Sequence, residues 1–294
     1  MSQARNRWIV NVVLVVAVIA FVGISMVPLL TGFVQSQSTK PGNTTNPTST
    51  PVPTNEKSKL EDQARGYESV LQREPENKVA LQGLLEARLQ LLRLGQGNIK
   101  GVIEPLEKLA KLNPEKTEYT ILLAQAKQQI GEPEAAAAAY RSILQTKPGD
   151  IKALQGLVVL LLQQKRPEAA IGLLQDTLTN STQANKIQPG SVDTTSVKLL
   201  LAQVYVTQKR SSDAISLYDQ LIKNDKQDFR PLLAKAIVVK DQGKTEEAKP
   251  LFDQAAALAP ANVKDKINQL ATSPLTPSTA PSTAPSAGGK ETKD

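Results

Sequence analysis

A pattern of small, apolar and proline residues recurs along the chain at a nearly constant spacing. Its clearest copy reads Ala136, Tyr140, Ile143 and Pro148. Six copies end at positions 75, 114, 148, 182, 226 and 260, so that successive copies lie 39, 34, 34, 44 and 34 residues apart. Three spacings of 34, with the other two longer by five and ten, indicate a helical-hairpin repeat that carries two insertions.

The same frame orders both helices of each hairpin. The first helix repeats a pair of small or apolar residues, at Leu84-Leu85, Leu123-Ala124, Leu157-Val158, Leu201-Ala202 and Lys235-Ala236. The second helix repeats one large residue, at Tyr67, Tyr140, Tyr218 and Phe252, which we expect in the core. Gly131 and Gly243 stand where first helices should end.

This pattern resembles the tetratricopeptide repeat (TPR) family over roughly residues 60–262. The resemblance implies an all-α chain, an α-solenoid of TPR helical hairpins. The sequence departs from the family pattern in three ways. The usual tryptophan of the first helix is absent, Lys235 replaces an expected leucine, and Pro105 and Pro250 fall inside second helices, where each should kink or shorten the first turns.

The flanking segments differ in composition from the repeats. Residues 9–30 carry no charge, with Trp8 at one end of the run and Ile9 and Leu30 as its limits, which predicts a transmembrane anchor within 1–34. A cleaved signal peptide is the alternative, although its apolar run is usually shorter. We expect a disordered Ser/Thr/Pro linker at 35–58 and a disordered Pro/Ala/Ser/Thr tail at 274–294. The TPR solenoid then occupies 59–273, as about five repeats plus a leading helix and a capping helix.

The charge on either side of the apolar run predicts an orientation. Arg5 and Arg7 precede the run, whereas only Lys40 follows it closely. The positive-inside rule then predicts a single-pass membrane protein with a cytoplasmic N-terminus, in the thylakoid or plasma membrane. The TPR domain would lie on the periplasmic or thylakoid-lumen side.

Composition excludes most chemistry. The chain has no His and no Cys, which removes imidazole acid–base catalysis, thiol nucleophiles and the usual zinc, haem and iron–sulfur ligands. Aromatic residues make up 3% of the chain, too few for stacking on nucleic acid. Of the net charge of +7, the region 59–273 supplies +4, from 29 basic and 25 acidic residues with both signs interspersed. We expect no enzyme activity, no cofactor, no metal, no nucleic acid and no small-molecule substrate.

TPR solenoids bind partners through a concave groove lined by first helices, so the resemblance implies a protein-binding groove here. The matching positions hold Gln82, Glu86, Gln90, Gln125, Gln128, Gln129, Lys152, Gln155, Val159, Gln163, Gln203, Thr207, Arg230, Ile237 and Lys240. Glutamine amides suit the main chain of an extended peptide or the polar edge of a helix, and the aliphatic residues supply contact area. Alternatively, these glutamines are only good helix formers on a wet surface.

A narrower resemblance concerns the last full repeat. The stretches 228–232 (Asp-Phe-Arg-Pro-Leu) and 243–248 (Gly-Lys-Thr-Glu-Glu-Ala) are similar to the plastid slow-green type TPR proteins of oxygenic phototrophs. That resemblance implies a membrane-anchored scaffold, an assembly or biogenesis factor for a photosynthetic membrane complex whose partner is a subunit or another assembly factor. The alternative is a chaperone or quality-control adaptor of the secretion or cytochrome-maturation machinery.

Overall fold

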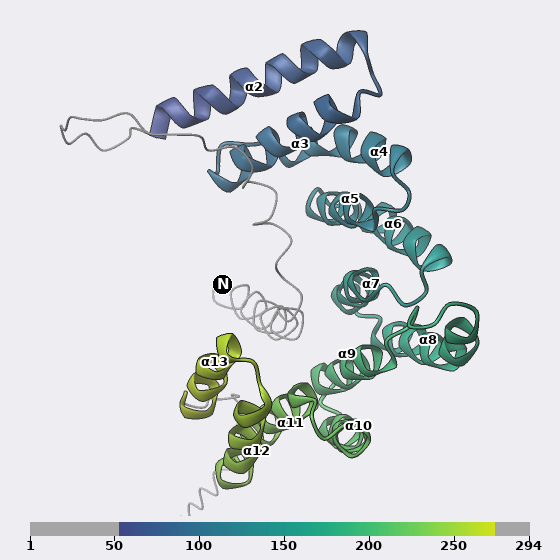
Figure 1. The fold of residues 1–294 in the computed structure, drawn as a ribbon, viewed down its shortest axis with the longest axis vertical. Coiled ribbons are helices and arrows are strands. Elements are labelled where there is room, and N and C mark those ends of the chain that lie inside the picture. Colours follow the sequence, from purple (N-terminus) through teal and green to yellow (C-terminus); the bar gives the residue numbers. More distant parts are fainter. Residues whose placement is uncertain (1–52, 274–294) are drawn as a thin grey trace, which may run out of the picture. The chain divides into compact units, whose positions relative to one another are not determined.

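The computed structural model describes residues 53–273, which contain twelve α-helices, one 3₁₀ helix and no β-strand (Figure 1). The helices are α2 (Pro53–Arg73), α3 (Lys78–Arg93), the 3₁₀ helix η2 (Ile99–Val102), α4 (Ile103–Leu112), α5 (Thr117–Gln129), α6 (Pro133–Thr146), α7 (Ile151–Gln163), α8 (Pro167–Ile187), α9 (Thr194–Thr207), α10 (Ser211–Asn224), α11 (Phe229–Asp241), α12 (Thr245–Leu258) and α13 (Ala261–Thr272).

The described residues fall into two compact units, which divide between Leu217 and Tyr218, inside α10. In the first unit each helix from α2 to α9 packs against the next, and α7 also contacts α5 and α9, the first helices of the neighbouring hairpins. In the second unit α11 packs against α12, and α12 against α13. The predicted all-α solenoid of helical hairpins is confirmed.

The repeat frame also locates the core correctly. Both members of the predicted first-helix pairs are buried in four repeats, whereas Lys235 is half-buried and its ammonium lies 2.5 Å from the carboxylate of Asp219. Tyr140, Tyr218 and Phe252 are buried, and burial raises the pKa of both tyrosines. Tyr67, at the same repeat position in α2, is half-buried.

Two of the second-helix tyrosines face a first-helix glycine sixteen residues further along the chain. A Cβ added to Gly156 would lie under 3.0 Å from the Tyr140 ring, and one added to Gly83 would lie as close to the Tyr67 ring. Between these two pairs along the chain, the second-helix residue is Leu106 of α4, and the position sixteen residues later is Leu122 of α5, which packs in the same apolar cluster. These three junctions between successive hairpins therefore use two packing solutions, a tyrosine on a glycine or two leucines in one apolar cluster.

All five first helices end in the same backbone motif. The residue after the C-cap has positive φ, and the next residue donates its N–H to a carbonyl five residues back, as from Gln96 to Leu91 at 2.9 Å and from Arg166 to Leu161 at 2.8 Å. The positive-φ residue is Gly95, Gly131 or Gly243 in three of these turns, but Lys165 and Lys209 in the other two, each with φ of 59°.

These two lysines lead to a prediction about stability. A residue with a Cβ costs about 1 kcal/mol more than glycine in the left-handed region. We therefore expect Lys165→Gly and Lys209→Gly each to raise the free energy of unfolding by about 0.5 to 1 kcal/mol, measured by urea denaturation. The reverse change, Gly131→Lys, should lower it by a similar amount, and equal stabilities in all three variants would contradict the argument.

The longer insertion is an ordered part of the first unit. It extends α8 and ends in a turn in which the Asn185 amide binds both backbone groups of Val192, at 2.9 and 3.0 Å, and Val192 is buried. The backbone of Ser191 and Val192 lies so close to Gly149 that a Cβ there would lie under 3.0 Å from the Ser191 carbonyl oxygen. Glycine at this position lets the insertion pack against the turn between α6 and α7.

One helix boundary and the effect of one proline differ from expectation. The helix α2 begins at Pro53, inside the predicted disordered linker, because proline fits the first turn of a helix and the acidic Glu56 is favourable in that turn. Pro105 has the expected shortening effect, since α4 starts only at Ile103, after the 3₁₀ turn, and has 10 residues. Pro250, in contrast, is accommodated inside α12, which keeps 14 residues.

The localisation requires a correction. Within residues 53–273 no helix is both long and apolar enough to cross a membrane, and this finding contradicts the prediction of a single-pass membrane protein. The two longest helices, α2 and α8, have 21 residues each but carry charged and polar side chains along their length. The segment predicted as the anchor, 1–34 with Trp8, Ile9 and Leu30, lies outside the described residues, as does the predicted tail at 274–294.

Candidate functional site

The predicted groove positions of the first unit lie on four first helices, α3, α5, α7 and α9. Five of these side chains are exposed: Glu86, Gln125, Gln129, Lys152 and Gln163. Seven are half-buried: Gln82, Gln90, Gln128, Gln155, Val159, Gln203 and Thr207. Because successive first helices carry these residues at equivalent positions, the helices present a face rich in uncharged amides, which we call the glutamine face.

Two hydrogen bonds connect the glutamine face from helix to helix. The Gln82 amide donates to the Tyr119 hydroxyl at 2.8 Å, between α3 and α5, and the Gln128 amide donates to the Gln163 carbonyl oxygen at 2.5 Å, between α5 and α7. These bonds place the faces of α3, α5 and α7 next to each other. The role of Tyr119 as a hydrogen-bond partner was not predicted, because a tyrosine at that position is not part of the repeat pattern.

Four glutamines of the face keep their amides available. Within the part of the chain that the structure describes, no hydrogen bond engages the side chains of Gln125, Gln129, Gln155 and Gln203. Each amide has two N–H donors and one acceptor oxygen. The donors can bind the carbonyl oxygens of a peptide main chain, and the oxygen can accept from its N–H groups. The half-buried Val159 lies on the same face and offers apolar contact. Chemically, these amides can pair with a polypeptide backbone without selecting for charge.

A cleft of about 380 Å³ lies between α2 and α3 in the first unit. Two predicted groove residues, Glu86 and Gln90, line it together with Gln63 and Tyr67 of α2; its other lining residues are Glu56, Lys59, Leu60, Gly83 and Ala87. The contribution of α2 was missed by the sequence reasoning, which placed this segment partly in the linker. Gly83 was the available signal, since a glycine inside a first helix indicates close approach of the preceding helix.

In the second unit Lys240 is used for packing rather than exposed for binding. It is 8% exposed, and its ammonium donates to the backbone carbonyls of Leu270, Ala271 and Ser273 at 2.5, 3.0 and 2.7 Å. The same ammonium lies 5.7 Å from the centre of the Phe252 ring. Lys240 thus binds the last carbonyls of α13, where the helix dipole is negative. Ile237 is half-buried on the same helix.

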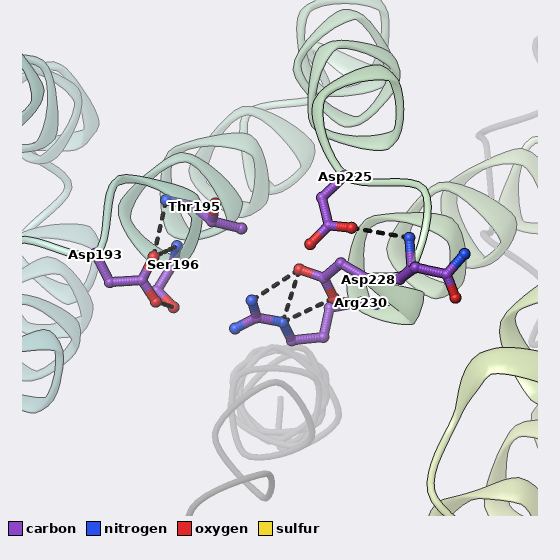
Figure 2. A network of polar contacts seen from close by, with 7 residues as sticks. Asp193, Thr195, Ser196, Asp225, Asp228 and Arg230 are labelled. Atoms are coloured by element: carbon purple, nitrogen blue, oxygen red, sulfur yellow. Dashed lines mark hydrogen bonds and ion pairs between the residues drawn. The ribbon is translucent and has the colours of Figure 1, made fainter. Parts of the chain in front are cut away.

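Arg230 is likewise held by its own helix start. Asp228 is the N-cap of α11: its carboxylate accepts the Arg230 N–H at 2.9 Å and also binds the guanidinium, at 2.7 Å from Nη2 (Figure 2). Figure 2 also shows the corresponding cap in the first unit, where Asp193 accepts the N–H groups of Thr195 and Ser196 at 3.0 and 3.2 Å. Aspartate at these caps fixes where first helices begin.

Residues 53–273 contain no group of three or more Asp, Glu, His or Cys side chains placed to hold a metal ion. Several acidic side chains of the described helices serve as caps or in ion pairs, such as Glu68 with Arg88 at 2.5 Å.

The chain is 28% identical over 186 residues to the chloroplastic protein SLOW GREEN 1 of Arabidopsis thaliana, a match that covers 63% of this chain and 56% of that protein. Among solved structures, a tetratricopeptide repeat protein from Parabacteroides merdae is 14% identical, with a TM-score of 0.45, over 74% of this chain and 80% of that one. A TPR protein of Thermus thermophilus is 20% identical, with a TM-score of 0.40, over 65% of this chain and 98% of that one.

The sequence model of the tetratricopeptide repeat matches residues 84–260, which is more than half of the chain. Proteins built from this repeat are generally scaffolds for protein–protein interaction and not enzymes. The observed hairpins and the repeat frame agree with that match, and the chain belongs to the tetratricopeptide repeat family.

Proposed function

We propose that this chain binds a segment of a partner protein on the glutamine face of α3, α5, α7 and α9. The observation that carries the proposal is the set of four amides, on Gln125, Gln129, Gln155 and Gln203, that no other described side chain or backbone group engages. An extended peptide, or the polar edge of a helix, satisfies these amides through its own main-chain groups. Val159 adds apolar area next to them.

We further propose that the partner is a subunit or an assembly factor of a photosynthetic membrane complex, which this chain holds during biogenesis. Two likenesses support this: the match to SLOW GREEN 1, a chloroplastic protein, and the similarity of residues 228–232 and 243–248 to slow-green type proteins. The match spans about half of that relative, so the assignment of the partner rests on these likenesses alone.

The glutamine face is tested by changing its charge without changing its shape. In the triple variant Gln125→Glu, Gln155→Glu, Gln203→Glu, each amide donor is replaced by a carboxylate oxygen that repels main-chain carbonyls. We expect the recovery of the partner to fall by about tenfold or more, since several hydrogen bonds are lost together. The measurement is affinity purification of the tagged protein from the cells that make it, with quantitative mass spectrometry.

The matched control makes the same change elsewhere on the first unit. Gln72, Gln145 and Gln183 are exposed on α2, α6 and α8, and their replacement by glutamate should leave both binding and stability unchanged. Equal recovery of the partner in both triple variants would refute the glutamine face as the binding site. Recovery of secretion or cytochrome-maturation components in place of photosystem subunits would refute the proposed partner while leaving the binding face intact.

A further inference from the structure

Two turns of the first unit carry the same tripeptide. Gln164-Lys165-Arg166 connects α7 to α8, and Gln208-Lys209-Arg210 connects α9 to α10. In both turns the lysine and the arginine are exposed. The three remaining turns of this type contain glycine at the lysine position and no such pair of cations. Adjacent repeats therefore present an identical pair of basic side chains at equivalent places.

The backbone at both lysines is unfavourable for a residue with a side chain. Lys165 and Lys209 adopt φ of 59°, in the left-handed region that the other turns reserve for glycine. Attraction between a cation and the C-terminal end of a helix explains the arginines, which follow directly. It does not explain the lysines, because a glycine before each arginine would keep that attraction without the backbone cost. Costly backbone conformations at exposed sites are a reason to look for function.

The two turns belong to neighbouring hairpins that contact each other: α7 packs against α9, and the Gln175 amide of α8 donates to the Tyr205 hydroxyl of α9 at 3.4 Å. Arg210 donates from Nε to Asp213 at 2.7 Å, and its guanidinium lies 4.4 Å from the centre of the Tyr205 ring, which together hold it in place. The hydrogen bond to Asp213 raises the pKa of Arg210, and Glu168, which follows the first basic turn, contributes to the same shift.

We propose that Lys165, Arg166, Lys209 and Arg210, which we call the basic edge, form a second binding surface that takes an acidic segment of a partner protein. This surface is separate from the glutamine face and does not depend on it. Neighbouring packed helices lie about 8–10 Å apart, so turns two helices apart are on the order of 20 Å from each other. An extended acidic segment of about six or more residues spans that distance.

The surrounding charges favour a protein segment over an anionic membrane surface. Glu168 and Asp213 lie in the first turns of α8 and α10, directly after the two basic turns, and Glu134 of α6 accepts a hydrogen bond from the Gln164 amide at 3.2 Å. A continuous anionic surface would meet these carboxylates as well as the cations and be repelled by them. A peptide can instead place its own carboxylates against the two basic pairs and uncharged residues between them.

The test uses the full chain and a defined probe, the fluorescein-labelled peptide acetyl-(Glu-Glu-Gly)₄-amide, with its (Gln-Gln-Gly)₄ counterpart as the uncharged control. Fluorescence anisotropy at low salt should show that the chain binds the acidic peptide and does not bind the uncharged one. The affinity for the acidic peptide should fall as salt is added. The variant Lys165→Asn, Lys209→Asn removes both charges and keeps a residue that tolerates positive φ. We expect about a fivefold loss of affinity, since each exposed ion pair contributes about two- to threefold.

A second variant separates the basic edge from general charge. Lys111→Gln, Lys186→Gln removes two exposed cations from α4 and α8 and should leave the affinity unchanged. Equal losses in both variants, or no binding of the acidic peptide by the unchanged chain, would overturn the proposal. So would tighter binding to phosphatidylglycerol vesicles than to the peptide with the same dependence on Lys165 and Lys209, because that result would assign the edge to lipid.

Discussion

Replacing Gly156 by leucine should destabilise the first unit by about 3 kcal/mol or more. The Tyr140 ring is 1% exposed and lies so close to Gly156 that even a single added carbon would be under 3.0 Å from it. A buried ring has no free space to move into, so the added side chain forces the helices α6 and α7 apart. Urea denaturation followed by circular dichroism measures the loss.

A second substitution should recover most of this stability. The repeats already contain the alternative: α4 and α5 have Leu106 and Leu122, in one apolar cluster, at the positions where α6 and α7 have Tyr140 and Gly156. The double variant Tyr140→Leu, Gly156→Leu recreates that solution, and we expect it to be within about 1 kcal/mol of the unchanged chain. The double-mutant cycle should then give a coupling energy of about 2 kcal/mol or more between the two positions. Additive losses would show that the two positions do not share one packing space.

A smaller substitution, Gly156→Ala, adds only the Cβ, and alanine at two other glycines is its control. Gly172 lies inside α8 with no atom within 4 Å of an added Cβ, so Gly172→Ala should stabilise the helix by about 1 kcal/mol. Gly83 touches the ring of Tyr67, which is half-buried and can move toward solvent, so Gly83→Ala should cost less than Gly156→Ala. The order of the three variants therefore follows the freedom of the facing ring.

The repeat spacing was sufficient to predict the hairpins and their core because both depend on residues at fixed distances along the chain. Leu157 and Val158 are buried as expected, and so is Tyr140. The same spacing did not predict that the Tyr140 ring packs on Gly156, because a glycine inside a helix by itself indicates only a lower helix propensity. Nor did it predict positive φ at Lys165, since lysine is a good helix former and the turn geometry overrides that preference.

The glutamine face was predictable only as a set of positions. Family geometry places Gln125, Gln128 and Gln163 on first helices, but the sequence does not tell which amides bond to each other and which stay available. The structure pairs Gln128 with Gln163 and leaves the amide of Gln125 without a hydrogen bond among the described residues. Side-chain pairing between helices depends on their separation and rotation, which a single sequence does not contain.

Lys240 is the clearest case in which burial changes the interpretation of a residue. At its repeat position a lysine indicates a binding cation, yet its ammonium caps the carbonyls of Leu270, Ala271 and Ser273. No backbone donor is available to those carbonyls at the end of α13, where the last turn of a helix leaves its acceptors unpaired. A lysine reaching over from α11 therefore connects the capping helix to the hairpin of α11 and α12.

We expect Lys240→Met to release α13 from the second unit. Methionine keeps the apolar stem but has no donor, so three carbonyls lose a charged hydrogen-bond partner at a cost of about 2 to 3 kcal/mol. Amide hydrogen exchange should become faster throughout α13, including at Ile267, which is fully buried, while α11 keeps most of its protection. Lys244→Met, which removes an exposed lysine 3.7 Å from Glu247, should change stability by less than about 0.5 kcal/mol. Equally slow amide hydrogen exchange of α13 in both variants would show that apolar contacts alone hold this helix. Lys240 would then again be a candidate for binding a partner.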